Sequence, residues 1–204
     1  MTAASLAELE DWAMVAASWH PAPTTEERHV TKRPLVLLDV DGVLNPARRH
    51  SLWLRRHDCV LDGQTYRILL SRRHGRRLAA LARDADAELA WATTWEQHAN
   101  DHISPRIGLP SLPVIKVNSD PGSRAGEHFK TRHVAEYVAG RPFVWFDDSL
   151  GTPDWQYLKD HPGVDEFLLV EVDPRTGLTD RHLAQAREWL AGRATPDLDG
   201  AGAP

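Results

Sequence analysis

The sequence predicts an α/β domain of three layers (α/β/α), built on a mainly parallel sheet with a small β-hairpin flap. Apolar β-prone runs alternate along the chain with segments of helical periodicity. The runs are almost continuously apolar, as strands buried on both faces are. The 204 residues, 42% hydrophobic and 26% charged, fit one globular domain of ordinary size.

The first part of the chain is expected to lie outside this domain. Ser5 and Glu8 match a capping box, and apolar residues recur every three or four positions over residues 5–18, which predicts an amphipathic helix. Residues 20–33 contain two prolines and no periodicity, which is typical of a connector. We therefore expect an N-terminal helix and connector over residues 1–33.

The domain itself is expected over residues 34–191. Its predicted strands cover residues 34–40, 87–92, 112–117, 142–146 and 167–172. Its predicted helices cover residues 72–84, 95–102, 130–138 and 180–191. Between residues 59 and 69, Asp62-Gly63 separates two β-prone segments, which predicts a two-residue hairpin turn. Residues 192–204, rich in Gly, Pro, Ala and Asp, are expected to form a disordered tail.

Several classes of protein are disfavoured. No stretch approaches the roughly 18 apolar residues of a membrane span, and the N-terminal residues lack the pattern of a secretory signal, so we expect a cytoplasmic protein. The single cysteine, Cys59, excludes a disulfide framework and metal sites made of several thiolates. His98 and His102 lack the companions of a zinc site and are interpreted as structural or solvated. Serine-nucleophile and dinucleotide-binding motifs do not occur.

Charge is segregated along the chain. Residues 48–83 hold ten arginines and two acids, which gives this segment a charge of +8. Because the net charge of the chain is −5, the other residues together carry a charge of −13. This segment forms either a face that attracts anions such as phosphates or the solvated face of a helix.

The ends of the predicted strands carry the candidate chemistry, because ligands of parallel sheets bind outside the carboxyl ends of the strands. The first strand ends in Asp39-Val-Asp41-Gly, and a later one ends in Asp147-Asp148. Four converging acids repel one another unless some are protonated or a hard cation lies among them, and oxygen ligands with a phosphate partner favour Mg²⁺.

Three further residues are candidates for holding an anion at the same edge. Thr93 and Thr94 follow the second strand and lead into a helix, where hydroxyl and backbone N–H groups can bind phosphate, although helix capping is the alternative. Lys130 begins the helix before the Asp147 strand and can supply a positive charge. Lys116, at the end of its own apolar run, is the rival candidate.

These motifs, in this order, resemble those of the haloacid dehalogenase-like (HAD) superfamily of aspartate-nucleophile phosphohydrolases, whose domains have a Rossmann-like fold. Asp39, Asp41 and Gly42 match its Asp-x-Asp-Gly motif. Thr93 or Thr94 matches its second motif, Lys130 its third, and the pair Asp147-Asp148 its fourth. The resemblance covers roughly residues 34–172.

The resemblance implies a reaction and a role for each motif. Asp39 would attack phosphorus and form an aspartyl-phosphate, while Asp41 would protonate the leaving oxygen and later activate water. Mg²⁺ would be held by the Asp39 carboxylate, the Asp41 backbone carbonyl and one acid of the Asp147-Asp148 pair, with Asp148 favoured. Thr93 (or Thr94) and Lys130 would bind the phosphate oxygens.

The resemblance also bears on the substrate. Fewer than thirty residues separate Asn45 from the helix near Arg72, and residues 103–129 mostly supply a strand and loops, so there is little room for the cap domain that many superfamily members carry. We therefore expect an open site suited to a nucleic-acid end, a protein, or a small substrate covered by oligomerisation. Trp91-Ala-Thr-Thr-Trp95 resembles the second motif of HAD domains linked to RNA-repair proteins. Five tryptophans are candidates for stacking on bases, although core packing is the more common role of such residues. They are Trp53, Trp91, Trp95, Trp145 and Trp155.

The sequence thus predicts a Mg²⁺-dependent phosphatase for a phosphomonoester, either a small molecule such as a nucleotide or a nucleic-acid end, with no membrane partner. A phosphotransferase or a dehalogenase of the same superfamily is a rival, and Asp41 disfavours the dehalogenase because it supplies the acid that phosphate esters need. A catalytically silent module that binds phosphate or RNA is the alternative from another class.

Overall fold

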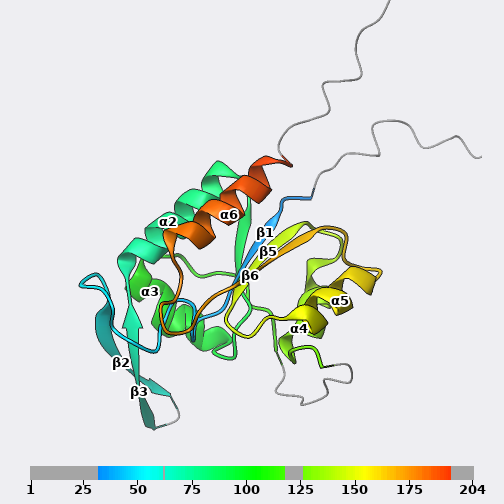
Figure 1. Ribbon diagram of the computed structural model, residues 1–204. Helices are drawn as coiled ribbons and strands as arrows, with labels where there is room; N and C mark the ends of the chain where they lie inside the picture. The colour runs from blue at the N-terminus through cyan, green and yellow to red at the C-terminus, as the bar shows by residue number, and fades with distance from the viewer. Residues whose placement is uncertain (1–31, 62, 118–125, 194–204) are drawn as a thin grey trace, which may run out of the picture. The chain divides into compact units, whose positions relative to one another are not determined.

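Four parallel strands form the central sheet in the computed structural model, which describes residues 32–61, 63–117 and 126–193 (Figure 1). In spatial order the strands are β4 (Glu88–Trp91), β1 (Leu35–Leu38), β5 (Phe143–Asp147) and β6 (Phe167–Glu171). Register is regular: Leu38 pairs with Trp91 on one side and with Phe146 on the other. The carboxyl ends of β1, β4 and β5 therefore meet at one edge of the sheet.

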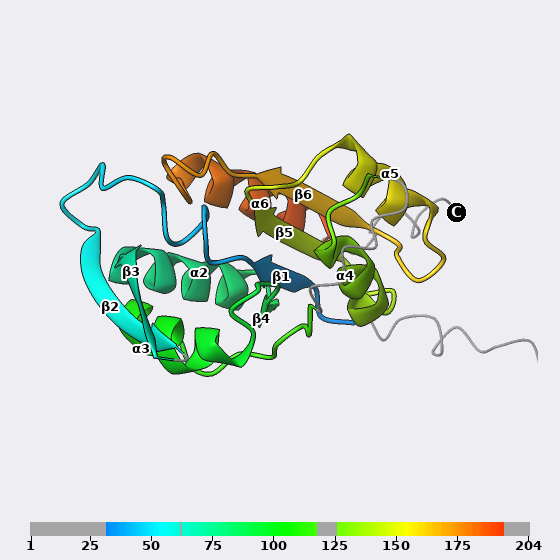
Figure 2. The same ribbon diagram turned by 90° about the horizontal axis from the view of Figure 1, so that it is seen from below.

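Helices cover both faces of the sheet, which confirms the predicted three layers (Figures 1 and 2). Successive side chains of a strand point to opposite faces, and all four residues of β1 are buried. Val36 and Leu38 pack in the core beneath α2 (Arg72–Asp84) and α6 (Asp180–Ala191). Leu35 and Leu37 pack in the second core, beneath the two remaining long helices. Those helices are α4 (Lys130–Val138) and α5 (Thr152–Asp160).

The predicted hairpin is also confirmed. Strands β2 (Arg55–Leu61) and β3 (Gln64–Leu70) pair antiparallel, and the pairing of Leu61 with Gln64 leaves two residues for the turn. Gly63 takes a φ of 78°, a left-handed conformation that glycine adopts without strain. The hairpin stands outside the four-stranded sheet (Figure 2).

The prediction of a strand over residues 112–117 was wrong. This segment contains only an isolated parallel bridge between Trp91 and Val114. The Trp91 N–H donates to the Pro113 carbonyl and the Ile115 N–H to the Trp91 carbonyl, each at 2.8 Å. The segment therefore runs along β4, but prolines such as Pro113 have no N–H to continue the ladder.

The predicted helix over residues 95–102 begins later than expected. Glu96 has a φ of 44°, which keeps the first residues in a turn. A π-helical segment, η2 (Ala99–Ile103), then continues into α3 (Ser104–Ile107). Helix α5 was not predicted, although Gly151-Thr-Pro-Asp154 has the proline and the acid that are typical of a helix start.

Two other predictions about segments of the chain stay open. The helix expected over residues 5–18 lies outside the described residues, as does nearly all of the tail expected from residue 192. None of the helices that the structure describes is long and apolar enough to cross a membrane.

Gly75, inside α2, provides a test of the packing between α2 and α3. Replacing a helical glycine by alanine ordinarily stabilises a helix by about 1 kcal/mol. Here a Cβ would overlap the backbone carbonyl of Ile107. We expect Gly75→Ala to lower the free energy of unfolding by about 1–3 kcal/mol, as overpacked substitutions do.

Urea unfolding of the Gly75→Ala variant checks this expectation. Gly192→Ala is the matched control, because the atom nearest to its new Cβ would be the Trp189 carbonyl oxygen at 3.7 Å, an ordinary contact. A gain in stability at Gly75 would contradict the packing described here.

Candidate active site

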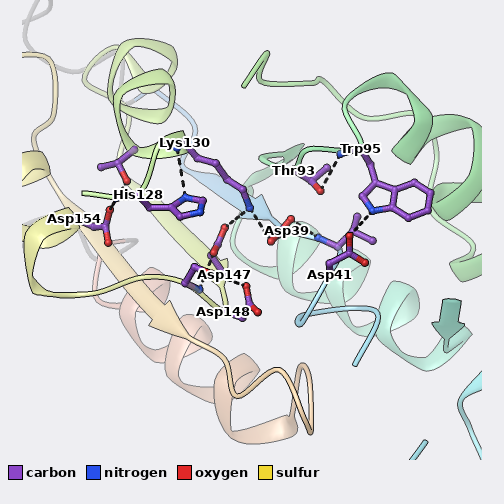
Figure 3. Close-up of polar contacts among 12 residues, drawn as sticks. Asp39, Asp41, Thr93, Trp95, His128, Lys130, Asp147, Asp148 and Asp154 are labelled. Atoms are coloured by element: carbon purple, nitrogen blue, oxygen red, sulfur yellow. Dashed lines mark hydrogen bonds and ion pairs between the residues drawn. The ribbon is translucent and has the colours of Figure 1, made fainter. Parts of the chain in front are cut away.

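Three carboxylates converge at the edge where β1 and β5 end (Figure 3). Asp39 directly follows β1, Asp147 is the last residue of β5, and Asp148 is its neighbour. One carboxylate oxygen from each of the three residues lies within 4.8 Å of the other two. The sequence predicted that four acids share this site, and the structure places three of them in one cluster that does not include Asp41.

The Lys130 side chain lies between two of these acids (Figure 3). Its Nζ is 2.7 Å from Asp39 Oδ2 and 2.8 Å from Asp147 Oδ2, and all three side chains are buried. Burial works to lower the pKa of Lys130, but Asp39 and Asp147 raise it above its ordinary value, so the lysine stays charged. The rival residue, Lys116, is exposed.

One ammonium group does not balance three carboxylates. Burial raises the pKa of Asp39 to about 6, and Asp147 adds to this rise while Lys130 and Thr93 oppose it. Burial also raises the pKa of Asp147. The site thus carries an excess of negative charge in a desolvated place, and this excess favours a further cation.

The two acids of the Asp147-Asp148 pair are not equivalent. Asp147 Oδ2 accepts from Lys130 and its Oδ1 accepts from the Ser149 N–H at 3.0 Å, so both oxygens already have donors. Asp148 is half-buried and, within the part of the chain that the structure describes, accepts only from the Ser149 hydroxyl, at 3.1 Å. Its oxygens are therefore the more available of the two to a metal ion.

Gly42 makes room for the Asp148 carboxylate. A Cβ at this position would overlap Asp148 Oδ2, and the φ of 76° also favours glycine. The Asp-x-Asp-Gly sequence thus allows the loop after β1 to approach the acid that follows β5. An oxygen-rich pocket of this kind fits the ligand preference of Mg²⁺.

Asp41 occupies a different environment from Asp39. It is exposed, and each of its oxygens accepts one hydrogen bond: Oδ2 from Trp95 Nε1 at 2.7 Å and Oδ1 from Asn45 Nδ2 at 2.8 Å. The indole and the amide together fix the orientation of this carboxyl group. The motif resemblance did not assign to Trp95 or Asn45 the role of orienting Asp41. The contacts in the structure reveal this role.

Thr93 and Thr94 are separated by the structure. Thr93 is buried beside Asp39, where its hydroxyl contributes to lowering the pKa of that acid. Its Oγ1 also accepts from the Trp95 N–H at 3.4 Å. Thr94 is exposed. Of the two alternatives that the sequence left open, Thr93 has a place in the site, and its hydroxyl stabilises a turn and does not cap a helix.

Asp154 is a buried acid that sequence reasoning missed. Its Oδ1 accepts from the His128 N–H at 2.7 Å and from the Thr131 hydroxyl at 2.5 Å, and its Oδ2 accepts from the Gly151 N–H at 2.8 Å. It therefore joins the start of α4, which carries Lys130, to the start of α5. The sequence signal that could have revealed this role is the position of Asp154 in Gly-Thr-Pro-Asp, a pattern typical of a helix start.

The hairpin is attached to this site through Asn45. The Asn45 Oδ1 accepts from the Leu69 N–H of β3 at 2.8 Å, while its amide nitrogen binds Asp41. The Tyr66 ring lies edge-on to Trp95, with 6.2 Å between centroids. Among the described residues, only a loop and the hairpin lie between Asn45 and α2. No cap domain is therefore inserted at this point of the described chain, which agrees with the expected minimal cap.

The tryptophans divide into core and surface. Trp91 and Trp145 are fully buried and Trp95 is 7% exposed, so the idea that these three stack on bases was wrong. Trp53 and Trp155 are 64% and 44% exposed. Buried indoles at these positions fill the space between the sheet and its helices, as large aromatic residues commonly do.

Comparison with known proteins identifies the family. No curated protein matches the chain. Among solved structures, a Legionella pneumophila protein assigned to the HAD superfamily (subfamily III A) of hydrolases is similar over 80% of this chain and 86% of its own, with 16% identity and a TM-score of 0.41. The family model of the HAD domain in Swiss Army Knife RNA repair proteins matches residues 35–183, which span all four strands of the sheet and the site. The resemblance seen in the motifs is therefore confirmed: the chain belongs to the family of HAD domains found in Swiss Army Knife RNA repair proteins.

Proposed function

We propose that this protein is a Mg²⁺-dependent phosphatase that forms an aspartyl-phosphate on Asp39. One observation carries the proposal: Asp39, Asp147 and Asp148 each place an oxygen within 4.8 Å of the others, and the buried Lys130 pairs with the first two. The exposed Asp41, two residues after Asp39, is held in one orientation by Trp95. Phosphoryl transfer needs mainly positioning and charge neutralisation, and this set of groups can supply both.

Asp39 and Asp41 divide the reaction into two steps. An Asp39 oxygen attacks phosphorus, the ester P–O bond breaks, and the Asp41 carboxyl group gives its proton to the leaving oxygen. The Asp41 carboxylate then takes a proton from water as the water oxygen attacks the same phosphorus. The bond from phosphorus to Asp39 breaks, and inorganic phosphate leaves.

The surrounding residues hold the reacting groups. Lys130 fixes the Asp39 carboxylate and, with Thr93, lies where phosphate oxygens would need donors. Trp95 and Asn45 keep the Asp41 carboxyl group in one orientation. Asp39, the Asp41 backbone carbonyl and Asp148 would hold Mg²⁺, which when bound supplies positive charge against the phosphate oxygens.

The proposed substrate is a phosphomonoester, including a nucleotide or a nucleic-acid end. The described residues place no cap domain over the site, and Asp41 is exposed, so a large substrate has access. Membership of a family named for RNA repair proteins favours a nucleic-acid end. A silent phosphate-binding module would bind the same ligands without turnover, so turnover separates the two functions.

Asp39→Asn is the first test of this function. We expect it to reduce Mg²⁺-dependent phosphate release by about a thousandfold or more, because the amide cannot act as the nucleophile. Release is measured from an aryl phosphate, a panel of nucleotides and RNA 3′-phosphates, with and without Mg²⁺. Asp160→Asn, a surface acid on α5, is the control. Wild-type protein that binds Mg²⁺ and phosphate without turnover would support the silent module instead.

Asp148→Asn tests the proposed metal ligand. We expect it to weaken Mg²⁺ binding at least about tenfold, because a metal ligand and a negative charge are lost together. Calorimetric titration with MgCl₂ measures this binding without any need for turnover. Asp84→Asn, on the surface of α2, removes the same charge far from the cluster and should bind as the wild type does. Equal affinities for the Asp148 variant and the wild type would rule out this ligand.

Trp95→Phe tests the orientation of Asp41. Phenylalanine keeps most of the apolar packing but loses the N–H donor, a hydrogen bond to a charged group worth about 1.5–3 kcal/mol. We expect kcat to fall about ten- to hundredfold while KM changes little, because binding contacts are preserved.

Trp91→Phe is the matched control for this substitution. It also removes a buried indole donor, which binds Asn100 Oδ1 at 3.0 Å and not an acid of the site. Its effect should appear in thermal stability and not in kcat. Similar losses of kcat in the two variants would show that Trp95 acts only through packing.

A further inference from the structure

A concave site lies between β2, α2 and α3, lined by none of the catalytic candidates. It is a cavity of about 650 Å³, within the range of about 300–1,000 Å³ typical of ligand sites. We call it the arginine cavity, because five guanidinium groups from three elements line it beside one exposed indole. These residues are Arg55, Arg72, Arg73, Arg76, Arg106 and Trp53. Figure 1 shows the start of α2 meeting the base of the hairpin.

The charges of the arginine cavity are poorly compensated. No aspartate or glutamate lines it. Arg55, Arg72 and Arg76 are exposed and form no ion pair with the residues that the structure describes. Five like charges around one hollow repel one another, so the site favours a ligand that brings several negative charges.

The arginines that do have partners still face the cavity. Arg73 lies 3.7 Å from an Asp180 oxygen, a long ion pair on the surface. Arg106 donates to the backbone carbonyls of His102, at 2.6 Å, and of Asp58, at 3.5 Å, so its charge is not neutralised. Burial lowers the pKa of His57 at the cavity wall, and Arg106 and Arg55 lower it further, as expected in a positive field.

The start of α2 adds to this field. Its first residues are Arg72 and Arg73, and no acid lies in its first turn. The N-terminus of a helix carries a partial positive charge, so acids are the residues normally favoured there. Arginines at this place cost stability, and an anion bound beside them would recover it.

Trp53 supplies a different kind of contact. Its side chain is 64% exposed, and neighbouring Leu52 is 90% exposed, which is unusual for large apolar residues. The Arg73 guanidinium lies 6.0 Å from the centre of the indole. A flat, exposed indole next to guanidinium groups can stack on a planar base whose phosphates bind the arginines.

We propose that the arginine cavity binds single-stranded nucleic acid. Free phosphate would not use Trp53, and a duplex would not offer an unstacked base to the indole. The acidic side chains of a peptide offer no aromatic ring to stack on Trp53, and a membrane surface does not fit a concave site.

Fluorescence anisotropy with a labelled oligouridylate of about 12 nucleotides tests the proposal. The oligonucleotide has hydroxyl groups at its termini, so it offers no phosphomonoester to the catalytic site. Binding is measured between about 50 and 200 mM KCl. Because the assay needs neither turnover nor Mg²⁺, its failure would leave the phosphatase proposal standing, and failure of the phosphatase would leave this site standing.

Two independent variants are compared with wild type. We expect Arg72→Gln/Arg76→Gln to bind about tenfold more weakly and to reduce the slope of log K against log salt by about 1.4, since each contact to a single strand contributes about 0.7. We expect Trp53→Ala to bind about tenfold more weakly because one base loses its stacking partner. This loss should change little with salt.

Arg181→Gln/Arg187→Gln is the matched control, since both arginines are exposed on α6 and the same two charges are removed. Its affinity and salt slope should stay close to those of wild type, and no variant should have a thermal midpoint below that of wild type. Three results would overturn the proposal. They are no binding by the wild type, an equal loss in the α6 variant, and competition by polyglutamate or anionic vesicles as effective as that by unlabelled oligouridylate.

Discussion

The convergence of buried carboxylates at one edge of the sheet is the constraint on which the rest of the site depends. Asp39 and Asp147 end neighbouring parallel strands, so their side chains meet because of the strand register. Two such acids are tolerated together only because Lys130 places one ammonium between them. Helix α4 must begin at the right point to do this, and Asp154 ties that starting point to α5. Fold and chemistry are thus set by the same contacts.

Most of the fold follows from short-range signals in the sequence. Continuous apolar runs predicted the strands, Asp62-Gly63 predicted the hairpin turn, and Ser71 caps α2 as a helix start requires. The failures have local causes. Pro113 stops residues 112–117 from forming a ladder, and the left-handed Glu96 delays the following helix. Neither effect is visible in apolar periodicity alone, because each depends on a single backbone group.

The site also has a part that the sequence predicts and a part that it does not. The candidate residues could be proposed from motif order, and the structure places all of them together except Asp41 and Thr94; those that meet are Asp39, Thr93, Lys130, Asp147 and Asp148. The contacts that orient them could not be proposed, because they join residues far apart in the sequence. Trp95 lies 54 positions from Asp41, and its indole could equally have served as core packing, as Trp91 and Trp145 do. The catalytic roles of the candidate acids, Thr93 and Lys130 remain predictions from the motifs.

Asn45 has a consequence for how this scaffold can vary. One side chain holds both Asp41 and Leu69, and Leu69 lies near the base of the hairpin, one residue from the end of β3. Tyr66, farther along the hairpin, packs against Trp95, which also holds Asp41, so only the turn around Gly63 takes no part in that anchor. This turn can be lengthened, shortened or exchanged without altering the orientation of the acid. The hairpin is therefore a modular arm, and the scaffold offers a way to graft new specificity onto a fixed reaction centre.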